Sequence, residues 1–241
     1  MKLTESVNLV GGAAYGYSAV GDCNIYLVDC NGEYALIDAG GGSGVKQILG
    51  NVRRMGFNEN DIRAILLTHC HFDHIGGAYE LKKATGCELM AHEADAASIE
   101  NLDENTLPDM AKERGISFRA PKLDRLLHDG EDVQVGDATF HVAHTPGHTP
   151  GCISIYFEEK DGAIGLFTGD IASSMGRLGF INGPGFDLNS WKRSLKRLIA
   201  IKPERMYPGH NTFVLSGALE QLRQTDDKMN SPWTTIVTSI G

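Results

Sequence analysis

Short apolar runs bounded by turn residues occur along most of the chain. Runs of this kind that are rich in branched and aromatic side chains are typical of β-strands. They span residues 24–29, 33–38, 64–68, 139–144, 152–158 and 164–168. The first two flank Asn31-Gly32, a pair that favours a tight hairpin turn. Helices are predicted over residues 45–55, 78–85, 189–201 and 216–229.

The order of these elements indicates an α/β fold. Strands occur in two groups, each followed by helices, which predicts two packed sheets with helices on the outside. The stretch 92–119 interrupts this rhythm with helical but weakly apolar residues, so we expect an inserted helical segment over one end of the sandwich. A chain of 241 residues in this class commonly forms one unit. We therefore expect a single domain over residues 1–241.

Composition excludes several classes of protein. No apolar run reaches the roughly 20 residues that a membrane-spanning helix needs. The N-terminus lacks an apolar core of secretory length, so we expect a cytoplasmic protein. Five cysteines without a C-x-x-C pair favour reduced thiols. A net charge of -9 argues against nucleic acid as a partner, and a small-molecule substrate is expected instead. A homodimer is left open.

The run from Thr68 to His74 contains three histidines and an aspartate directly after a predicted strand. In extended chain His69 and His71 share one side, while Cys70 points to the other and is expected to be a packed thiol. Neutral imidazole and carboxylate suit Zn, Fe or Mn. Four such donors so close together predict more than one ion, because a single tetrahedral ion is hard to surround with one short turn. The alternative is a surface cluster or a helix cap on Asp73.

Further donors follow at three other turns. His148 lies between two Pro-Gly pairs, Asp170 ends an apolar strand, and His210 follows Tyr207-Pro208-Gly209. Each is weak evidence alone, since such residues are more often loop or surface residues. All three, however, stand where a strand stops, and α/β folds assemble their sites there.

The run 69–74 together with His148, Asp170 and His210 resembles the metallo-β-lactamase superfamily, and this resemblance covers nearly the whole chain. It implies a four-layer αββα sandwich of two mixed β-sheets flanked by helices, with a dinuclear metal site at the sheet edges. It implies that one ion is held by His69, His71 and His148, a second by Asp73, His74 and His210, and that Asp170 bridges them. Asp38 matches the family's acidic position behind the ligands. The alternative for Asp38 is a turn former. His92, His128, His141 and His144 match no ligand position.

Two divalent ions about 3.5 to 4 Å apart lower the pKa of a water held between them towards neutrality. The expected enzyme is therefore a metal-dependent hydrolase in which a metal-bridging hydroxide attacks a small ester, thioester or lactone. Zinc is expected, with iron or manganese as alternatives. Asp73 and Asp170 are the expected catalytic carboxylates. Asp73 would anchor the second ion and accept a hydrogen bond from the hydroxide, and Asp170 would bridge the two ions.

Substrate choice depends on the loops. Residues 176–187 are predicted to form a substrate loop in which Arg177 binds a carboxylate and Phe180 adds apolar surface, with Tyr15 and Tyr17 nearby. The alternative is a plain connector. Glyoxalase-II-type thioesterases and acyl-homoserine lactonases are the most similar branches. The former share a C-terminal glutathione-binding extension that is largely missing after His210, and the latter carry a tyrosine where this chain has residues 171–175. If the protein is a lactonase, Tyr15, Tyr17 or Ser173 would have to serve as the hydrogen-bond donor in place of that tyrosine.

A different class of function remains as an alternative. Residues 68–71 are also similar to the persulfide dioxygenases, oxidoreductases that hold one iron on this scaffold. The complete second set of ligands argues against a mononuclear site. Diiron oxygen-reducing members lack support, because His71 stands where they carry a glutamate, and a non-catalytic binding protein is disfavoured by the full ligand set.

Overall fold

The computed structural model describes residues 1–177 and 183–232. Within these ranges one sheet has six strands in chain order. They are β1 (Val7–Gly11), β2 (Ile25–Asp29), β3 (Tyr34–Ile37), β4 (Ile62–Leu66), β5 (Glu88–His92) and β6 (Arg125–Leu127). The pairs from β1 to β3 are antiparallel and those from β3 to β6 are parallel. The sheet is therefore mixed, as the sequence predicted.

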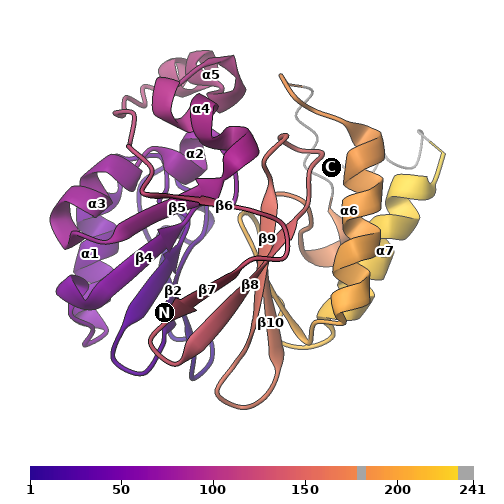
Figure 1. Ribbon diagram of the computed structural model, residues 1–241, viewed down its shortest axis with the longest axis horizontal. Helices are drawn as coiled ribbons and strands as arrows, with labels where there is room; N and C mark the ends of the chain where they lie inside the picture. The colour runs from indigo at the N-terminus through magenta and orange to yellow at the C-terminus, as the bar shows by residue number, and fades with distance from the viewer. Residues whose placement is uncertain (178–182, 233–241) are drawn as a thin grey trace.

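The second sheet has five strands among the described residues. In spatial order they are β11 (Arg205–Pro208), β10 (Ile164–Gly169), β9 (Ile153–Glu158), β8 (Ala138–His144) and β7 (Asp132–Val135). Only β10 and β11 pair in parallel; the other neighbours are antiparallel. The two sheets lie face to face in the middle of the molecule (Figure 1).

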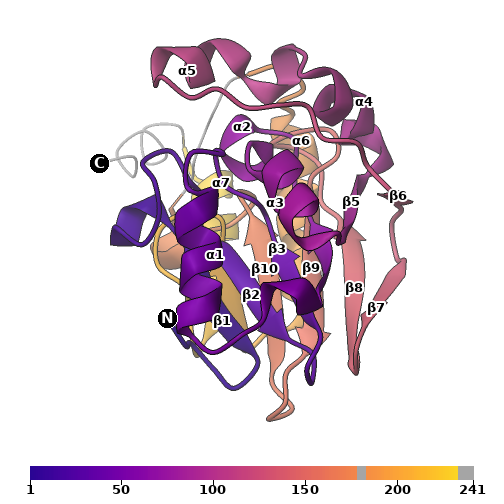
Figure 2. The same ribbon diagram turned by 90° about the vertical axis from the view of Figure 1, so that its left-hand side faces the viewer.

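Helices cover both outer faces of the sandwich (Figures 1 and 2). The first sheet carries α1 (Val45–Arg54) and α3 (Ala78–Thr85), and the second carries α6 (Leu188–Ile201) and α7 (Ala218–Asn230). Shorter helices are α2 (Phe72–Ile75), α4 (Glu93–Asn101), α5 (Pro108–Glu113), η1 (Ala13–Tyr15), η2 (Glu59–Asp61), η3 (Glu104–Thr106) and η4 (Ser174–Gly176). This confirms the four-layer αββα architecture.

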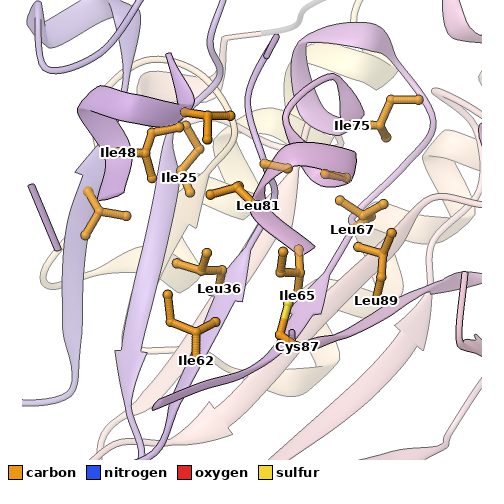
Figure 3. Packing of buried hydrophobic residues seen from close by; sticks show 14 of the residues in the cluster. Ile25, Leu36, Ile48, Ile62, Ile65, Leu67, Ile75, Leu81, Cys87 and Leu89 are labelled. Atoms are coloured by element: carbon orange, nitrogen blue, oxygen red, sulfur yellow. The ribbon is translucent and has the colours of Figure 1, made fainter. Parts of the chain in front are cut away.

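Strand alternation divides the core into layers. In β2, Ile25 and Leu27 face α1 and α3, while Tyr26 and Val28 face the opposite sheet. Figure 3 shows the helix-side cluster, in which Leu36 and Ile65 of the sheet pack beneath α1 and α3. Because successive side chains point to opposite faces, a strand buried on both faces is apolar at every position. That is why the runs were recognisable in the sequence.

Helix boundaries agree closely with the sequence, whereas several strands were not predicted. The helix predicted over 78–85 has those bounds, and α6 begins one residue before its predicted start. The prediction missed β1, β5, β6 and β7. In β7 every second residue is exposed, so the apolar signal is halved. The strand predicted over 64–68 is shifted, because β4 ends at Leu66 and the next residues leave the sheet.

The segment 92–119 contains α4, η3 and α5 and lies over the strand ends at the top of Figure 1. Its Arg114 guanidinium stands 5.7 Å from the ring centre of Phe72, next to the histidine run. A single domain over the whole chain stays a prediction. Among the described residues, no helix combines the length and apolar character needed to cross a membrane.

Candidate metal centre

Strand ends bring the predicted ligands to one edge of the sandwich. The loops after β3, β4, β8, β10 and β11 meet at this edge, under the segment 92–119 (Figure 1). Backbone hydrogen bonds join the two sheets there. Ile153 N–H donates to the Thr68 carbonyl at 2.8 Å, and Asn24 N–H donates to the Gly209 carbonyl at 2.7 Å. Residues from both sheets can therefore face one another at fixed separations.

His69, His71 and His148 form the first ligand group. Each contributes one nitrogen, and these atoms lie within 4.8 Å of one another. All three side chains are buried, and their ring centres are 4.5 to 4.9 Å apart. His69 and His71 share one side, as the extended run predicted. Cys70, which lies between them in the sequence, is buried with its thiol 3.5 Å from the Asn105 carbonyl, which agrees with a packed side chain.

The first ligand group fits a divalent cation. Within the part of the chain that the structure describes, Nε2 of His69 and both ring nitrogens of His148 are buried without a hydrogen-bond partner. A buried polar atom left this way costs about 1 to 3 kcal/mol. Burial lowers the pKa of all three imidazoles, that of His71 to about 3. They are therefore neutral at pH 7, the form that binds metals.

Asp73, His74 and His210 form the second ligand group, whose ligand atoms also lie within 4.8 Å of one another. Asp73 Oδ2 is 3.0 Å from His210 Nε2, which is 3.4 Å from His74 Nε2. Asp73 and His74 project from α2, a one-turn helix that the sequence predicted only as a turn. His74 is buried, while His210 is partly exposed and lies at the opening of the site.

Asp170 lies between the two ligand groups. Its Oδ2 is 3.5 Å from His148 Nε2 and 3.4 Å from His210 Nε2, and its Oδ1 is 3.4 Å from His74 Nε2. One carboxylate thus contacts a histidine of the first group and two of the second. Gly209 makes this approach feasible, because a Cβ there would lie 2.6 Å from Asp170 Oδ1.

The carboxylates of the centre are ionised. Burial would raise the pKa of Asp73, but His74 and His210 outweigh it and lower the pKa to about 2. The pKa of Asp170 is likewise held well below its usual value by His210 and His74 against the effect of burial. Two partly buried anions require positive charge nearby. Carboxylate and imidazole donors together suit Zn, Fe or Mn.

Asp38 supports both ligand groups from behind. Its Oδ2 lies 2.8 Å from Nδ1 of His74, and its carboxylate accepts hydrogen bonds from the backbone N–H and the hydroxyl of Thr68 at 2.8 to 3.0 Å. The Thr68 hydroxyl lies 3.1 Å from Nδ1 of His69. Asp38 has φ of 64°, a conformation that costs a non-glycine residue roughly 1 to 3 kcal/mol. The backbone is strained at the residue whose carboxylate contacts His74 directly and His69 through Thr68.

The residues predicted to bind substrate occupy different places. The Tyr15 hydroxyl donates to the Asn211 carbonyl at 3.0 Å, and Arg177 donates to the Asn211 side chain at 3.0 Å. Both therefore contact Asn211, the residue that follows the ligand His210 in the sequence. The Tyr17 hydroxyl instead accepts from the amino group of Met1 at 2.9 Å, outside the ligand groups. Phe180 lies outside the described residues.

Sequence reasoning missed three residues that organise the centre. The Thr68 hydroxyl connects the Asp38 carboxylate to the His69 ring through hydrogen bonds. In the sequence, only its position before the first histidine pointed to this role. Asn211 adopts φ of 66° directly after His210, and its side chain also donates to Ser173 at 3.0 Å. Asp95 of α4 contacts two ligand loops and left no signal, because it stands alone in a weakly apolar helix.

A cavity of about 40 Å³ adjoins Asp170, Ser173, His210 and Asn211.

Two mixed sheets between helices, with histidines and aspartates gathered at one edge, define an αββα sandwich with a metal-binding edge. The family model of the metallo-β-lactamase superfamily matches residues 19–210. The chain therefore belongs to the metallo-β-lactamase superfamily.

Similar proteins support this assignment. The chain is 33% identical over 196 residues to a hydroxyacylglutathione hydrolase of Rhodospirillum rubrum, covering 80% of this chain and 64% of that protein. It is 30% identical over 200 residues to a probable metallo-hydrolase of Methanocaldococcus jannaschii, covering 81% and 89%. A subclass B3 metallo-β-lactamase of Bradyrhizobium japonicum superposes with a TM-score of 0.77 at 25% identity, covering 100% and 96%.

Proposed function

We propose that the protein holds two divalent ions, one on each ligand group, and hydrolyses a small ester, thioester or lactone. The observation that carries this proposal is the position of Asp170, whose two oxygens lie 3.4 to 3.5 Å from histidines of both groups. A carboxylate that contacts histidines of both groups is suited to bridging two ions. Zinc is the expected metal, because it binds well to a mixed set of imidazole nitrogens and carboxylate oxygens.

When bound, the two ions would supply an activated water as the nucleophile and polarise the scissile carbonyl. The protein's own residues set the geometry for that chemistry. Asp170 holds the two ligand groups in register. Asp73, ionised at neutral pH, faces the opening and accepts a hydrogen bond rather than donating a proton. Asp38 and Thr68 fix the ring orientation of His74 and His69.

The rim of the site supports an anionic substrate. Arg177 is exposed, and its guanidinium donates a hydrogen bond to the side chain of Asn211, the residue after His210. The chain carries a net charge of -9, so a cation near the site gives local attraction to a carboxylate against the overall repulsion. The relationship to a hydroxyacylglutathione hydrolase supports a thioester, although the chain spans 64% of the length of that protein.

Metal analysis combined with an activity panel tests the proposal. The protein should carry two zinc ions per chain and hydrolyse at least one of a set of lactones, thioesters and esters, and chelation should abolish that activity. Phosphoesters and cephalosporins serve as comparison substrates. One iron per chain with oxygen consumption on a persulfide would overturn the proposal in favour of a dioxygenase.

A further inference from the structure

Asp95 lies in α4, within the segment 92–119, and its side chain is almost completely buried at 1% exposure. Its carboxylate accepts three hydrogen bonds. Oδ2 accepts from the Cys70 N–H at 3.0 Å and from the Thr149 hydroxyl at 2.7 Å. Oδ1 accepts from the Gly151 N–H at 2.7 Å. All three donors are neutral, so the carboxylate is balanced by oriented dipoles.

These donors belong to the loops that carry the first ligand group. Cys70 stands between His69 and His71, in the loop that follows β4 of the first sheet. Thr149 follows His148, in the turn between β8 and β9 of the second sheet. The two loops are far apart in the sequence, so only noncovalent contacts set the distance between their histidines. Asp95 is a single side chain bonded to both.

The turn is shaped to receive this carboxylate. A Cβ at Gly151 would lie 2.5 Å from Asp95 Cγ, a separation that real Cβ atoms do not show. A side chain at this position would therefore push the turn away from α4. The same turn fixes Thr149, whose hydroxyl also lies 3.1 Å from the buried Cys152 thiol.

We propose that Asp95 is a positioning residue that holds His69, His71 and His148 at the separation the first ion requires. Hydrogen bonds to an ionised acceptor are about twice as strong as neutral ones, so one buried carboxylate fastens two loops that belong to different sheets. Partners behind metal ligands typically contribute about 10 to 100-fold in metal affinity. The inference rests on the proposed metal centre but on no particular substrate or reaction.

Asp95→Asn keeps the shape of the side chain and leaves one acceptor oxygen for three donors. At least one buried donor then loses its partner, and one loop is released relative to the other. We expect the affinity for one of the two ions to fall about 10 to 100-fold, while the affinity for the other stays within about twofold. Thr149→Val replaces the hydroxyl by a methyl group and so removes one of the three hydrogen bonds to Asp95, and a smaller loss for the same ion is expected.

Asp124→Asn provides the matched control. Asp124 also accepts a backbone hydrogen bond, from Leu89 N–H at 2.8 Å, and one from Lys82 at 2.7 Å. It contacts neither ligand loop. This variant should lose stability without a change in either metal affinity.

The experiment is a competition titration of the full-length metal-free chain with Zn²⁺ against a chromophoric chelator. Urea unfolding of the metal-free proteins and the visible spectra of the Co²⁺ forms are measured alongside. A selective loss for one ion in Asp95→Asn, with a changed Co²⁺ spectrum, supports the inference. Unchanged affinities for both ions, together with reduced stability alone, overturn it. If Asp95→Asn does not fold, Thr149→Val decides by the same criterion.

The outcome is separable from that of the proposed function. A wild-type chain that binds two ions but hydrolyses no substrate of the panel overturns the proposed reaction, and a selective loss in Asp95→Asn still supports the positioning role. A wild-type chain that binds no ion overturns both.

Discussion

Oδ2 of Asp38 lies 2.8 Å from Nδ1 of His74, so the carboxylate fixes which nitrogen of this ring faces the metal centre. Asp38→Asn should lower the affinity for the second ion by about 10 to 100-fold, because the amide loses the charge that orients His74. Asparagine tolerates the positive φ of this position, so the backbone should keep its course. Zinc titration checks the loss, and unchanged affinity would contradict the role of Asp38.

Asp170→Ala should remove the contact between the two ligand groups. It should reduce kcat/KM by more than about 100-fold, the largest loss typical of residues that only hydrogen-bond to a metal ligand. The ions per chain should fall below those of the wild type. His141→Ala is the control, since His141 is partly exposed and pairs with Asp132 at 2.7 Å, away from the ligand groups. Equal losses in both variants would refute the ligand assignment.

Arg177→Ala should raise KM for an anionic substrate by the equivalent of about 1.5 to 3 kcal/mol, the contribution of a hydrogen bond to a charged group. The kcat should change little, because Arg177 lies at the rim and contacts Asn211 rather than the ligands. Arg63→Ala is a suitable control. Arg63 is an exposed arginine near the start of β4, far along the strand from the site. An unchanged KM for Arg177→Ala would rule out the anchor.

His92 gives a pH dependence of stability that does not involve the ligands. Burial and the neighbouring His144, 3.9 Å away ring to ring, lower the pKa of His92 to about 4 against the partial opposition of Glu93 and Asp129. His128 also faces this cluster and lowers the pKa further. The unfolded chain, with a pKa of about 6.5, therefore binds the proton more readily than the folded chain.

Stability from His92 is thus complete above about pH 6.5 and is lost as the pH falls towards 4, at about 1.4 kcal/mol for each pKa unit of difference. His92→Asn keeps an acceptor for the Ala94 N–H but cannot be protonated. Urea unfolding of the metal-free proteins between pH 4 and 8 should show a shallower slope for the variant. Parallel curves would mean that His92 does not contribute.

Much of the centre was predictable because its ligands are local in sequence or stand at strand ends. The run 69–74 lies after a buried strand, and alternation places His69 and His71 on one side. His148, Asp170 and His210 each follow a strand, and the structure brings them to the same edge. Tyr17 shows the limit of this reasoning. It was predicted with Tyr15 to bind substrate, but its hydroxyl accepts a hydrogen bond from the amino group of Met1.

The sequence by itself determined most of the strands, the outer helices and the donor types, because apolar runs and the chemical identity of each side chain can be read from the residues themselves. The tertiary structure alone decided that Asn211 accepts a hydrogen bond from Arg177 and that Asp95 joins loops from opposite sheets. These relations join residues distant in the sequence, and strand periodicity carries no information about which loop ends meet across a sandwich. Packing of the two sheets supplies it.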